Sequence, residues 1–300
     1  MTTVQVWAGV DARGIASLNV MSDSRISWED PRRSGQGQRP QYLYDQGKKI
    51  FHCRNYPHIF AYCGDSLFAA LALSQLSDQI DSGIVSPRQG GQWGDVVHQA
   101  LDNLFEGYPT QVLGPSVTML HLSRSGDRME AKFHLESYTY RNRYDSEQPR
   151  RGRWIRHAYD LADVMEGSRT SKVIEVAGSG SPHLREIQAS RGLDSTARDT
   201  SRLIFANFIA WLDQANGPES PDPRSGGAPQ MCRLIRIGNP RPVGLVYNRR
   251  KHFGGASIPK PTDTLEVSWH NKHFEIVDPR TRRKKARAQT HSDLKGMAPG

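Results

Sequence analysis

The N-terminal residues carry the pattern that most constrains the fold, which is that of a β-hairpin. Apolar and polar residues alternate over residues 3–10 and again over residues 14–21, and the residues from Asp11 to Gly14 favour a tight turn. The sequence therefore predicts an antiparallel hairpin that starts at residue 2, so the fold contains an antiparallel sheet from its first residues.

Further strand and helix patterns follow the hairpin in blocks. Apolar residues at helical spacing predict a helix that starts at Asp65 or Ser66, a second from Asp95 and a long one over residues 200–212. Grouped strands and helices are typical of the α+β class, with helices packed on antiparallel sheets, and not of alternating βαβ units. The expected strands are residues 48–52, 59–62, 117–122, 131–135, 172–177, 231–237, 243–247 and 265–269.

Two stretches interrupt these patterns and are interpreted as insertions. The first, residues 29–46, is rich in Gly, Pro, Arg and Gln as far as Pro40, and the second, residues 138–170, begins with a polar stretch rich in Arg and Tyr. We expect one domain over residues 2–279 that carries both insertions as surface loops, followed by a basic C-terminal tail over residues 280–300.

The net charge of +9 comes mostly from this tail. Seven basic residues and Asp293 give residues 280–300 a charge of +6, so only +3 is left for the first 279 residues. A tail of Lys, Arg, Ala, Gly and Pro cannot bury enough apolar surface to fold, and we expect it to be disordered. It either stays solvated or binds an acidic partner. One alternative function is therefore nucleic-acid binding through the tail and the Arg-rich residues 138–156.

Several function classes lack the residues that they need. No apolar run approaches the roughly 18 residues of a membrane span, and the first twenty residues lack the basic and apolar regions of a cleaved signal peptide. We therefore expect a soluble, cytoplasmic protein. Cys53, Cys63 and Cys232 form no Cys-x-x-Cys pair and the eleven histidines show no metal-ligand spacing, so we expect neither a metal nor another cofactor. The Gly-Ser-Gly at 178–180 lacks the Gly-Lys-Ser/Thr of a phosphate loop, and no Gly-x-Ser-x-Gly nucleophile elbow is present.

The second residue offers a nucleophile and a base together. Removal of the initiator Met before the small Thr2 is expected and leaves a free amine at the tip of the first strand. An α-amino group has a pKa of about 7.7–8.0 and can act as a base at neutral pH, whereas a Thr hydroxyl is a useful nucleophile only beside a base. Many proteins begin with Met-Thr, so this feature alone does not indicate an enzyme.

Five further motifs accompany Thr2 in an order that resembles a known family. The six are Met-Thr-Thr-Val at 1–4, Ser-Asp-Ser-Arg at 22–25, Lys-Lys-Ile at 48–50, Tyr-Cys-Gly-Asp at 62–65, Gly-Ser-Gly at 178–180 and Asp-Pro-Arg-Ser-Gly-Gly at 222–227. In this order they resemble the β subunits of the proteasome and the related bacterial ring protease that works with an AAA+ unfoldase. Those proteins are N-terminal nucleophile hydrolases. The resemblance covers about residues 2–80 and 172–238, and it implies a four-layer αββα sandwich.

The resemblance implies a role for each matching residue. Thr2 would be the nucleophile and its amine the general base, with the charge of Lys49 near its hydroxyl and Asp23 holding Lys49 in place. The backbone N–H of Gly64 would donate a hydrogen bond to the developing oxyanion, where a residue without a side chain fits. The other implied positions are Ser179, Asp222 and Ser225 around the Thr2 amine, Ser27 aligning the substrate backbone, and Tyr62 lining the pocket for the side chain before the scissile bond.

The sequence departs from the family pattern at two points. The loop between Asp23 and Lys49 is longer than the family's usual one, so their pairing depends on an insertion that folds outward. Asp65 stands where the family has a second Gly, and its carboxylate either caps the helix or biases the pocket toward basic side chains. Without the family, Asp23 and the segments 178–180 and 222–227 are ordinary turns, and Lys49 is a surface lysine on a strand.

The implied activity is hydrolysis of peptide bonds, in peptides or unfolded proteins, by an N-terminal threonine. Subunits of the family assemble into rings with internal active sites, so the resemblance also implies a homo-oligomer and a possible AAA+ ATPase partner. A catalytically inactive structural subunit is a second alternative. Against it stands the complete set of Thr2, Asp23, Lys49, Ser179, Asp222 and Ser225.

Overall fold

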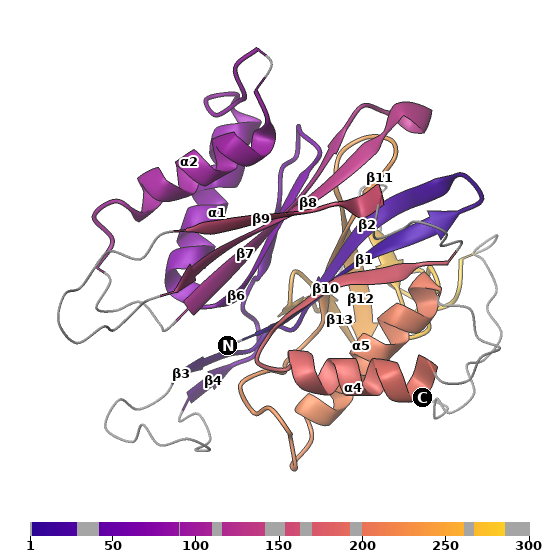
Figure 1. Cartoon of the computed structure of the whole chain (residues 1–300). Helices are drawn as coiled ribbons and strands as arrows, with labels where there is room; N and C mark the ends of the chain where they lie inside the picture. The colour runs from indigo at the N-terminus through magenta and orange to yellow at the C-terminus, as the bar shows by residue number, and fades with distance from the viewer. Residues whose placement is uncertain are drawn as a thin grey trace.

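The computed structural model describes residues 2–28, 42–89, 91–109, 116–141, 154–162, 170–192, 200–260 and 267–285. In these residues the strands form two large sheets and one small one (Figure 1). The eight-stranded sheet runs in the order β10 (Lys172–Gly178), β1 (Thr3–Asp11), β2 (Gly14–Ser22), β11 (Gln230–Ile235), β12 (Arg241–Tyr247), β13 (Arg250–Phe253) and β14 (Ala256–Ser257), and β15 (Ser268–His270) pairs with β12 in parallel.

The second large sheet has five strands in chain order. They are β5 (Ile50–His52), β6 (His58–Gly64), β7 (Ser116–Ser125), β8 (Lys132–Arg141) and β9 (Ile155–Tyr159), all paired antiparallel, with the short 3-10 helix η3 (Arg128–Glu130) between β7 and β8. The small sheet is the pair of β3 (Ile26–Trp28) and β4 (Tyr42–Tyr44).

The predicted N-terminal hairpin is confirmed, and it lies inside the larger sheet. β1 pairs with β2 on one side and with β10 on the other, and β11 then pairs with β2. Because β1 is flanked on both sides, the start of this strand lies next to the end of β2 and the end of β10. These three strand ends position the candidate site.

The helices cover the outer faces of the two sheets. α1 (Ser66–Asp81) and α2 (Trp93–Phe105) pack on the five-stranded sheet through one hydrophobic cluster, and α4 (Ser181–Gly192) and α5 (Ser201–Ala215) pack on the larger sheet through another. A third cluster lies between the two sheets, with Val6 and Leu18 on one side and Ile59 and Leu120 on the other. Figure 1 shows the two helix pairs on opposite sides of the sheets. The general α+β class is therefore confirmed.

The cap expected at Asp65 is present on α1, and Thr200, to which the sequence analysis gave no capping role, caps α5. The Asp65 carboxylate accepts a hydrogen bond from the Phe68 N–H at 3.1 Å, and the Thr200 hydroxyl accepts one from the Leu203 N–H at 3.2 Å. Each satisfies a backbone donor that a helix N-terminus leaves without a partner. Asp65 thus has a capping role here.

The segment over residues 138–170 is less of a loop than its composition indicates. β8 continues through Arg141 and β9 covers Ile155–Tyr159, so the expected insertion begins in a strand and contains a second strand in its interior. Tyr138 and Tyr140 are fully buried beneath α1 and α2, and their alternation with residues 137 and 139 is a strand pattern that the arginines nearby obscure. Residues 142–153 and 163–169 lie outside the described residues, as does most of the first insertion, residues 29–41.

The beginning of the C-terminal tail is ordered, which corrects the expectation of disorder for residues 280–285. The Asp278 N–H donates to the Arg283 carbonyl at 2.8 Å, and the Lys285 N–H donates to the Ile276 carbonyl at 3.0 Å. Lys284 also lies 3.7 Å from the Glu275 carboxylate. Residues 286–300 lie outside the described residues.

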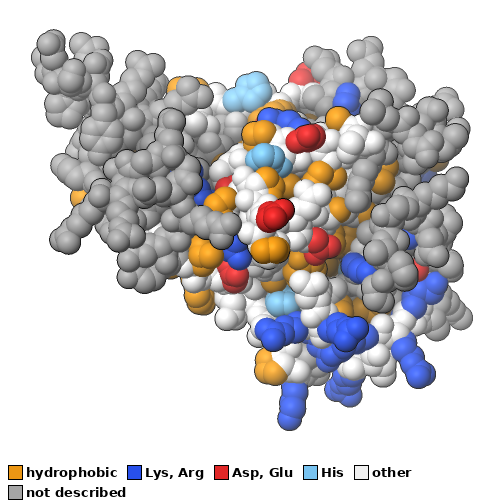
Figure 2. Space-filling view, turned by 90° about the horizontal axis from the view of Figure 1, so that it is seen from below, with side chains coloured by type: hydrophobic (Ala, Val, Ile, Leu, Met, Phe, Trp, Pro, Cys, Tyr) orange, Lys and Arg blue, Asp and Glu red, His pale blue; other side chains and the backbone are white. Residues whose placement is uncertain are grey.

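The sequence patterns gave no indication of α4, β13 or β14. No helix among the described residues is long and apolar enough to cross a membrane. Figure 2 shows Lys and Arg side chains gathered along one edge of the face seen from below, away from the acidic side chains near its centre.

Candidate active site

Thr2 immediately precedes β1 and is held there by the end of β10. Its carbonyl accepts a hydrogen bond from the Ser179 N–H at 3.1 Å, and Thr3 pairs with Gly178 across the two strands. A Cβ atom at Gly178 would lie 1.7 Å from the Thr2 carbonyl oxygen, and the φ of Gly178 is +99°. Glycine is therefore required at the position where β10 meets Thr2.

The alternation of β1 indicates which way the Thr2 side chain points. The Thr3 hydroxyl lies on the helix side of the sheet, 3.1 Å from the Ser225 Oγ, whereas Val4 packs between the two sheets. Successive side chains of a strand point to opposite faces, so Thr2 shares the face of Val4. Cys63 at the end of β6 belongs to the same inter-sheet cluster. The Thr2 side chain, 1% exposed, thus faces the end of the second sheet.

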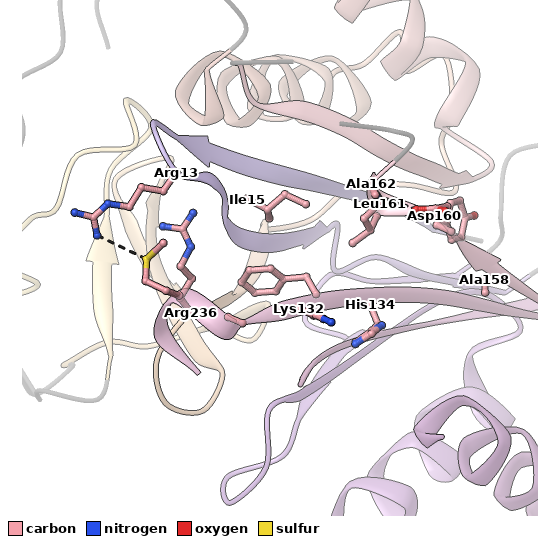
Figure 3. Close-up of a pocket in the computed structure, with 13 residues that line it drawn as sticks. Arg13, Ile15, Lys132, His134, Ala158, Asp160, Leu161, Ala162 and Arg236 are labelled. Carbon is pink, nitrogen blue, oxygen red and sulfur yellow. Dashed lines mark hydrogen bonds between the residues drawn. The ribbon is translucent and has the colours of Figure 1, made fainter. Parts of the chain in front are cut away.

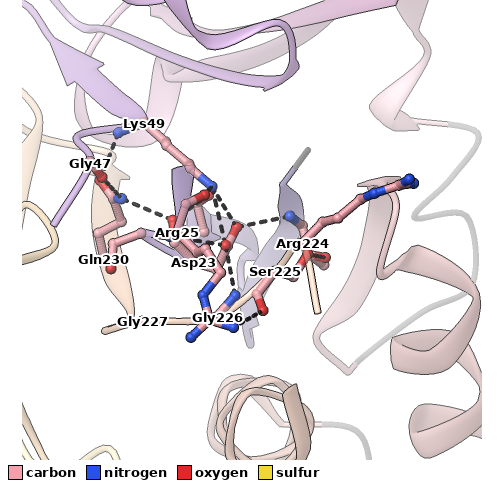
Figure 4. Close-up of polar contacts among 12 residues, drawn as sticks. Asp23, Arg25, Gly47, Lys49, Arg224, Ser225, Gly226, Gly227 and Gln230 are labelled. Carbon is pink, nitrogen blue, oxygen red and sulfur yellow. Dashed lines mark hydrogen bonds and ion pairs between the residues drawn. The ribbon is translucent and has the colours of Figure 1, made fainter. Parts of the chain in front are cut away.

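Asp23 and Lys49 form an ion pair that is completely buried. The Lys49 Nζ lies 3.1 Å from each carboxylate oxygen of Asp23 and 2.5 Å from the Arg25 carbonyl (Figure 4). Asp23 also accepts a hydrogen bond from the Thr3 N–H at 2.9 Å, which is the amide that follows Thr2. The structure therefore brings together the two residues that the sequence predicts to pair, and it places the ammonium close to the Thr2–Thr3 peptide bond.

Burial and charge act in opposite directions on Lys49. Complete burial lowers the pKa of Lys49, and the adjacent Asp23 carboxylate partly offsets that shift by favouring the charged form. Burial also raises the pKa of Cys63 to about 12, so this neighbouring thiol stays protonated at neutral pH. Cys63 is therefore not an alternative nucleophile at neutral pH.

Ser179, Asp222 and Ser225 form a second hydrogen-bonded cluster on the other side of β1. The Asp222 Oδ2 accepts a hydrogen bond from the Ser179 Oγ at 2.6 Å and from the Ser225 Oγ at 2.7 Å. The Ser225 Oγ also contacts the Thr3 hydroxyl, which links the cluster to the start of β1. All three residues therefore meet beside the start of β1, and their contact with the Thr2 amine stays a prediction.

The backbone of Gly226 joins the two clusters. Its N–H donates to the Asp23 Oδ2 at 3.0 Å, and its carbonyl accepts hydrogen bonds from the N–H groups of Ser24 and Arg25 at 3.0 and 2.9 Å (Figure 4). The segment after Asp222 is therefore fixed to the segment after β2.

Arg25 and Asp45 support this arrangement from the rim, although the sequence analysis gave them no role. The Arg25 guanidinium binds both carboxylate oxygens of Asp45 at 2.7 and 2.9 Å, and it donates to two carbonyls of the 222–227 segment. A bidentate pair of this kind fixes the orientation of the guanidinium. The arginine stands in the Ser-Asp-Ser-Arg motif, so its position beside Asp23 was the available signal.

Gln230 is a third supporting residue, and no sequence pattern pointed to it. Its side-chain oxygen accepts the Lys49 N–H at 3.0 Å, and its side-chain nitrogen donates to the carbonyls of Asp23 and Gly47 at 3.0 and 2.8 Å. One buried amide thus connects the backbones that carry both members of the ion pair. A single glutamine at a strand start has no signature in a sequence.

Gly64 ends β6 in a conformation that requires glycine for packing reasons. Its φ is +98°, and a Cβ atom there would lie 2.3 Å from the Ser116 carbonyl oxygen of β7. The preceding Cys63 faces the inter-sheet cluster that Thr2 also faces, so Gly64 lies next to the site along the chain. Its role as an oxyanion donor stays a prediction.

Ser27 is not gathered with the other candidates, whereas the Tyr62 N–H donates to the Lys49 carbonyl at 3.3 Å. Ser27 lies in β3, where it pairs with Leu43, and none of the hydrogen bonds of the described residues connects it to Asp23 or Asp222. The Tyr62 side chain is fully buried in the cluster beneath α1, and its hydroxyl donates to the Lys48 carbonyl at 3.4 Å. Tyr62 therefore serves the core in this structure, which corrects the expectation that it lines a substrate pocket.

The described residues contain no group of three His, Cys, Asp or Glu side chains placed to hold a metal ion. The polar side chains gathered at the site are hydroxyls, carboxylates, the Lys49 ammonium and the Arg25 guanidinium. Searches against protein-family models and against curated proteins gave no match to this chain.

Proposed function

We propose that this chain is an N-terminal nucleophile hydrolase that cleaves peptide bonds with Thr2. The observation that carries the proposal is the contact set of Asp23. One carboxylate binds Lys49, the amide that follows Thr2, and the 222–227 segment, so it joins three of the segments that form the site. A buried ion pair costs desolvation free energy, and a purely structural position is equally well filled by apolar residues.

Thr2 acts in the proposed mechanism once Met1 has been removed. The new α-amine, with a pKa of about 7.7–8.0, accepts the proton of the Thr2 hydroxyl as that oxygen attacks the peptide carbonyl carbon. The same ammonium then protonates the leaving amine, which yields an ester between the enzyme and the acyl part of the substrate. Water then attacks the carbonyl carbon of this ester, which breaks its bond to the Thr2 oxygen, releases the acyl part as a carboxylic acid and regenerates the Thr2 hydroxyl.

Lys49 stabilises the oxygen of Thr2 as negative charge develops on it. An ammonium has three N–H donors. Because both oxygens of Asp23 lie at the same distance from Nζ, one N–H between them can serve both, a second serves the Arg25 carbonyl, and the third is left for Thr2. A charge held in a site with no exposed surface acts more strongly than one in water.

Ser179, Asp222 and Ser225 hold the Thr2 amine in the proposed site, and Gly64 supplies the oxyanion donor. The Asp222 carboxylate lies beside the start of β1 and favours a protonated amine there, and the two serine hydroxyls orient it. The Gly64 N–H lies at the end of β6, next to the inter-sheet face that Thr2 shares.

The finer fold assignment belongs to the same proposal. The order of hydrophobic clusters, with helices outside each of two facing sheets, supports a four-layer αββα sandwich of the N-terminal nucleophile type. We also infer, from the sequence resemblance alone, a homo-oligomeric assembly, a possible AAA+ ATPase partner, and peptides or unfolded proteins as substrates.

The proposal is tested first by the state of the N-terminus and its consequence for activity. Intact mass of the native chain should show loss of Met1, and that chain should hydrolyse unstructured peptides from a mixed library, with new termini detected by mass spectrometry. The matched control carries an uncleavable tag before Thr2 and should release no product, because its Thr2 nitrogen is an amide. Equal cleavage by both chains contradicts the proposal.

A further inference from the structure

A second site lies at the far end of the hairpin from Thr2. A pocket of about 670 Å³ is bounded by the β1–β2 turn, by the segment from η3 into β8, and by the end of β9 (Figure 3). β1 is nine residues long, so this pocket lies roughly 25–30 Å from Thr2 at about 3.3 Å per residue. Its volume is within the range of small-molecule sites.

The floor of this pocket is apolar and continuous with the core. Phe133 and Leu161 belong to the cluster between the two sheets, and Ile15 packs against that cluster. Phe133 is 8% exposed and Leu161 is 6% exposed, so the remaining surface of both side chains is small. A ligand that covered this floor would extend the hydrophobic core outward.

The rim of the pocket is positively charged at one end. Figure 3 shows Arg13 and Arg236 together at that end, with Lys132 along the lower wall. Asp11 binds the Arg236 guanidinium through two contacts of 2.7 and 3.0 Å, which fixes its position. No salt bridge within 4.0 Å is made by Arg13 or Lys132 among the described residues. The Arg13 guanidinium contacts the Met129 sulfur at 3.8 Å. Hydrogen bonding to Arg236, helped by the charge of Arg13, lowers the pKa of Asp11.

The opposite end of the pocket carries a carboxylate. Asp160 lies there in Figure 3, beyond Ile15 and Leu161, and its Oδ1 accepts the Ala162 N–H at 2.9 Å. A ligand with a second negative charge at this end would meet Asp160. The charge pattern therefore favours a ligand with one anionic group and an apolar body.

We propose that this pocket binds the carboxylate of an apolar chain, with the carboxylate between Arg13 and Arg236 and the chain over Ile15, Phe133 and Leu161. Two sources share this chemistry, a free acyl carboxylate and the C-terminus of a polypeptide that ends in aliphatic residues. The site is independent of the proposed peptidase activity, because none of its residues belongs to the Thr2 site.

Calorimetric titration of the full chain with hexanoate, octanoate and decanoate tests the proposal. Each added CH₂ should tighten binding by about fourfold, since burial of one CH₂ is worth about 0.8 kcal/mol. Octanamide should bind at least tenfold more weakly than octanoate, because it lacks the charge that Arg13 and Arg236 recognise. The second arm compares the dipeptide Leu-Leu with a free C-terminal carboxylate and the same dipeptide with a C-terminal amide. This arm distinguishes a polypeptide C-terminus from a free acyl carboxylate as the source of the ligand.

Variants locate the binding. Arg13→Gln should weaken octanoate binding by about tenfold, and Ala158→Phe should abolish it by filling the pocket. Arg88→Gln makes the same charge change at an exposed position in the α1–α2 connection and should leave the affinity unchanged. Binding that does not depend on chain length, that is equal for acid and amide, or that survives Ala158→Phe overturns the proposal, as does the absence of binding by both series.

Discussion

The Lys49 Nζ lies 3.1 Å from both oxygens of the Asp23 carboxylate, and neither side chain has any exposed surface. The two residues are not equally dependent on each other. Asp23 receives three further hydrogen bonds, from the N–H groups of Thr3, Arg25 and Gly226, whereas the described contacts give Lys49 one other acceptor, the Arg25 carbonyl.

This asymmetry predicts unequal effects of removing either partner. Asp23→Asn places an amide among backbone donors and leaves the buried ammonium without a counter-charge, so it should cost about 3–5 kcal/mol of the free energy of unfolding. Lys49→Met should cost less, because Asp23 keeps its three backbone donors. The double variant should cost less than the sum of the singles, since the two residues are in contact.

Denaturant unfolding of the three variants measures these values. Asp127→Asn is the matched control, because Asp127 pairs with Arg124 at 3.2 Å but is half exposed, and its loss should cost less than about 1 kcal/mol. Additive effects of Asp23→Asn and Lys49→Met, or a cost equal to that of the control, would show that the buried pair is not a coupled unit.

Two glycines with the same φ provide a test of how Thr2 is positioned. Gly178 and Gly14 both have a φ of +99°, but a Cβ at Gly178 meets the Thr2 carbonyl, whereas a Cβ at Gly14 meets no atom within 4 Å. Gly14→Ala should therefore cost only the backbone strain, about 1–2 kcal/mol, and keep activity. Gly178→Ala should destabilise the fold by more and abolish peptidase activity, because Thr2 has to move.

The peptidase activity of both variants, measured at a temperature where both are folded, separates a loss of Thr2 positioning from a loss of stability. Retained activity in Gly178→Ala, with a stability equal to that of Gly14→Ala, would show that the contact between β10 and Thr2 is not needed.

Buried histidines predict that the fold loses stability in mild acid. Burial, together with the charge of the nearby Arg233, lowers the pKa of His270 to about 4. Because the folded-state pKa lies below the value of 6.5 in the unfolded chain, the unfolded state binds more protons between these values. The contribution of His270 is therefore complete above pH 6.5 and is lost as the pH falls from 6.5 to 4.

The His270→Phe variant measures this contribution. Its ring can keep the stacking on Phe274, whose centroid lies 5.1 Å from that of His270, but it takes up no proton. Between pH 6.5 and 4 the free energy of unfolding should fall in both chains. The fall in the variant should be smaller than that in the native chain by up to about 3 kcal/mol. Part of the slope should remain, because burial also lowers the pKa of His52 to about 4. Identical slopes in the two chains would contradict the assignment.

The C-terminal contacts predict where the chain can be shortened. A chain that ends after Pro279 loses the hydrogen bonds of Asp278 and Ile276 with residues 283 and 285 and the contact of Lys284 with Glu275. Its midpoint temperature should fall by several degrees, since about 1 kcal/mol corresponds to 2–4 °C at this size. A chain that ends after Lys285 keeps these contacts and should melt within about 1 °C of the full chain; equal melting of both truncations contradicts the structure.

The sequence predicted the fold best where the periodicity is local. The hairpin of β1 and β2 and the Asp65 cap depend on neighbouring residues, and both are confirmed. β9 was missed because its exposed residues alternate weakly, and Tyr138 and Tyr140 of β8 because a polar composition hid their burial. The ordered residues 280–285 were missed because backbone hydrogen bonds to Ile276 and Asp278 have no dependence on composition.

The residues of the candidate site also fall into those that local motifs predict and those that only the fold brings together. Asp23, Lys49 and the Ser179–Asp222–Ser225 cluster were predicted because short motifs carry them, and the structure brings them together. Tyr62 was misplaced because adjacent residues of β6 face opposite sides of the sheet, and no motif states which side. Gln230 was not found because its function depends on three backbones that only the fold assembles.

The most direct test of the central claim compares the hydrolysis rates of chains that differ only at Thr2. Thr2→Ala keeps the amine and removes the hydroxyl, Thr2→Ser keeps both groups, and Thr3→Ser keeps the hydroxyl that contacts Ser225. With Met1 removed from each chain, we predict no measurable peptide hydrolysis for Thr2→Ala, a reduced rate for Thr2→Ser and nearly the native rate for Thr3→Ser. Hydrolysis by Thr2→Ala at the native rate would contradict the assignment of Thr2 as the nucleophile.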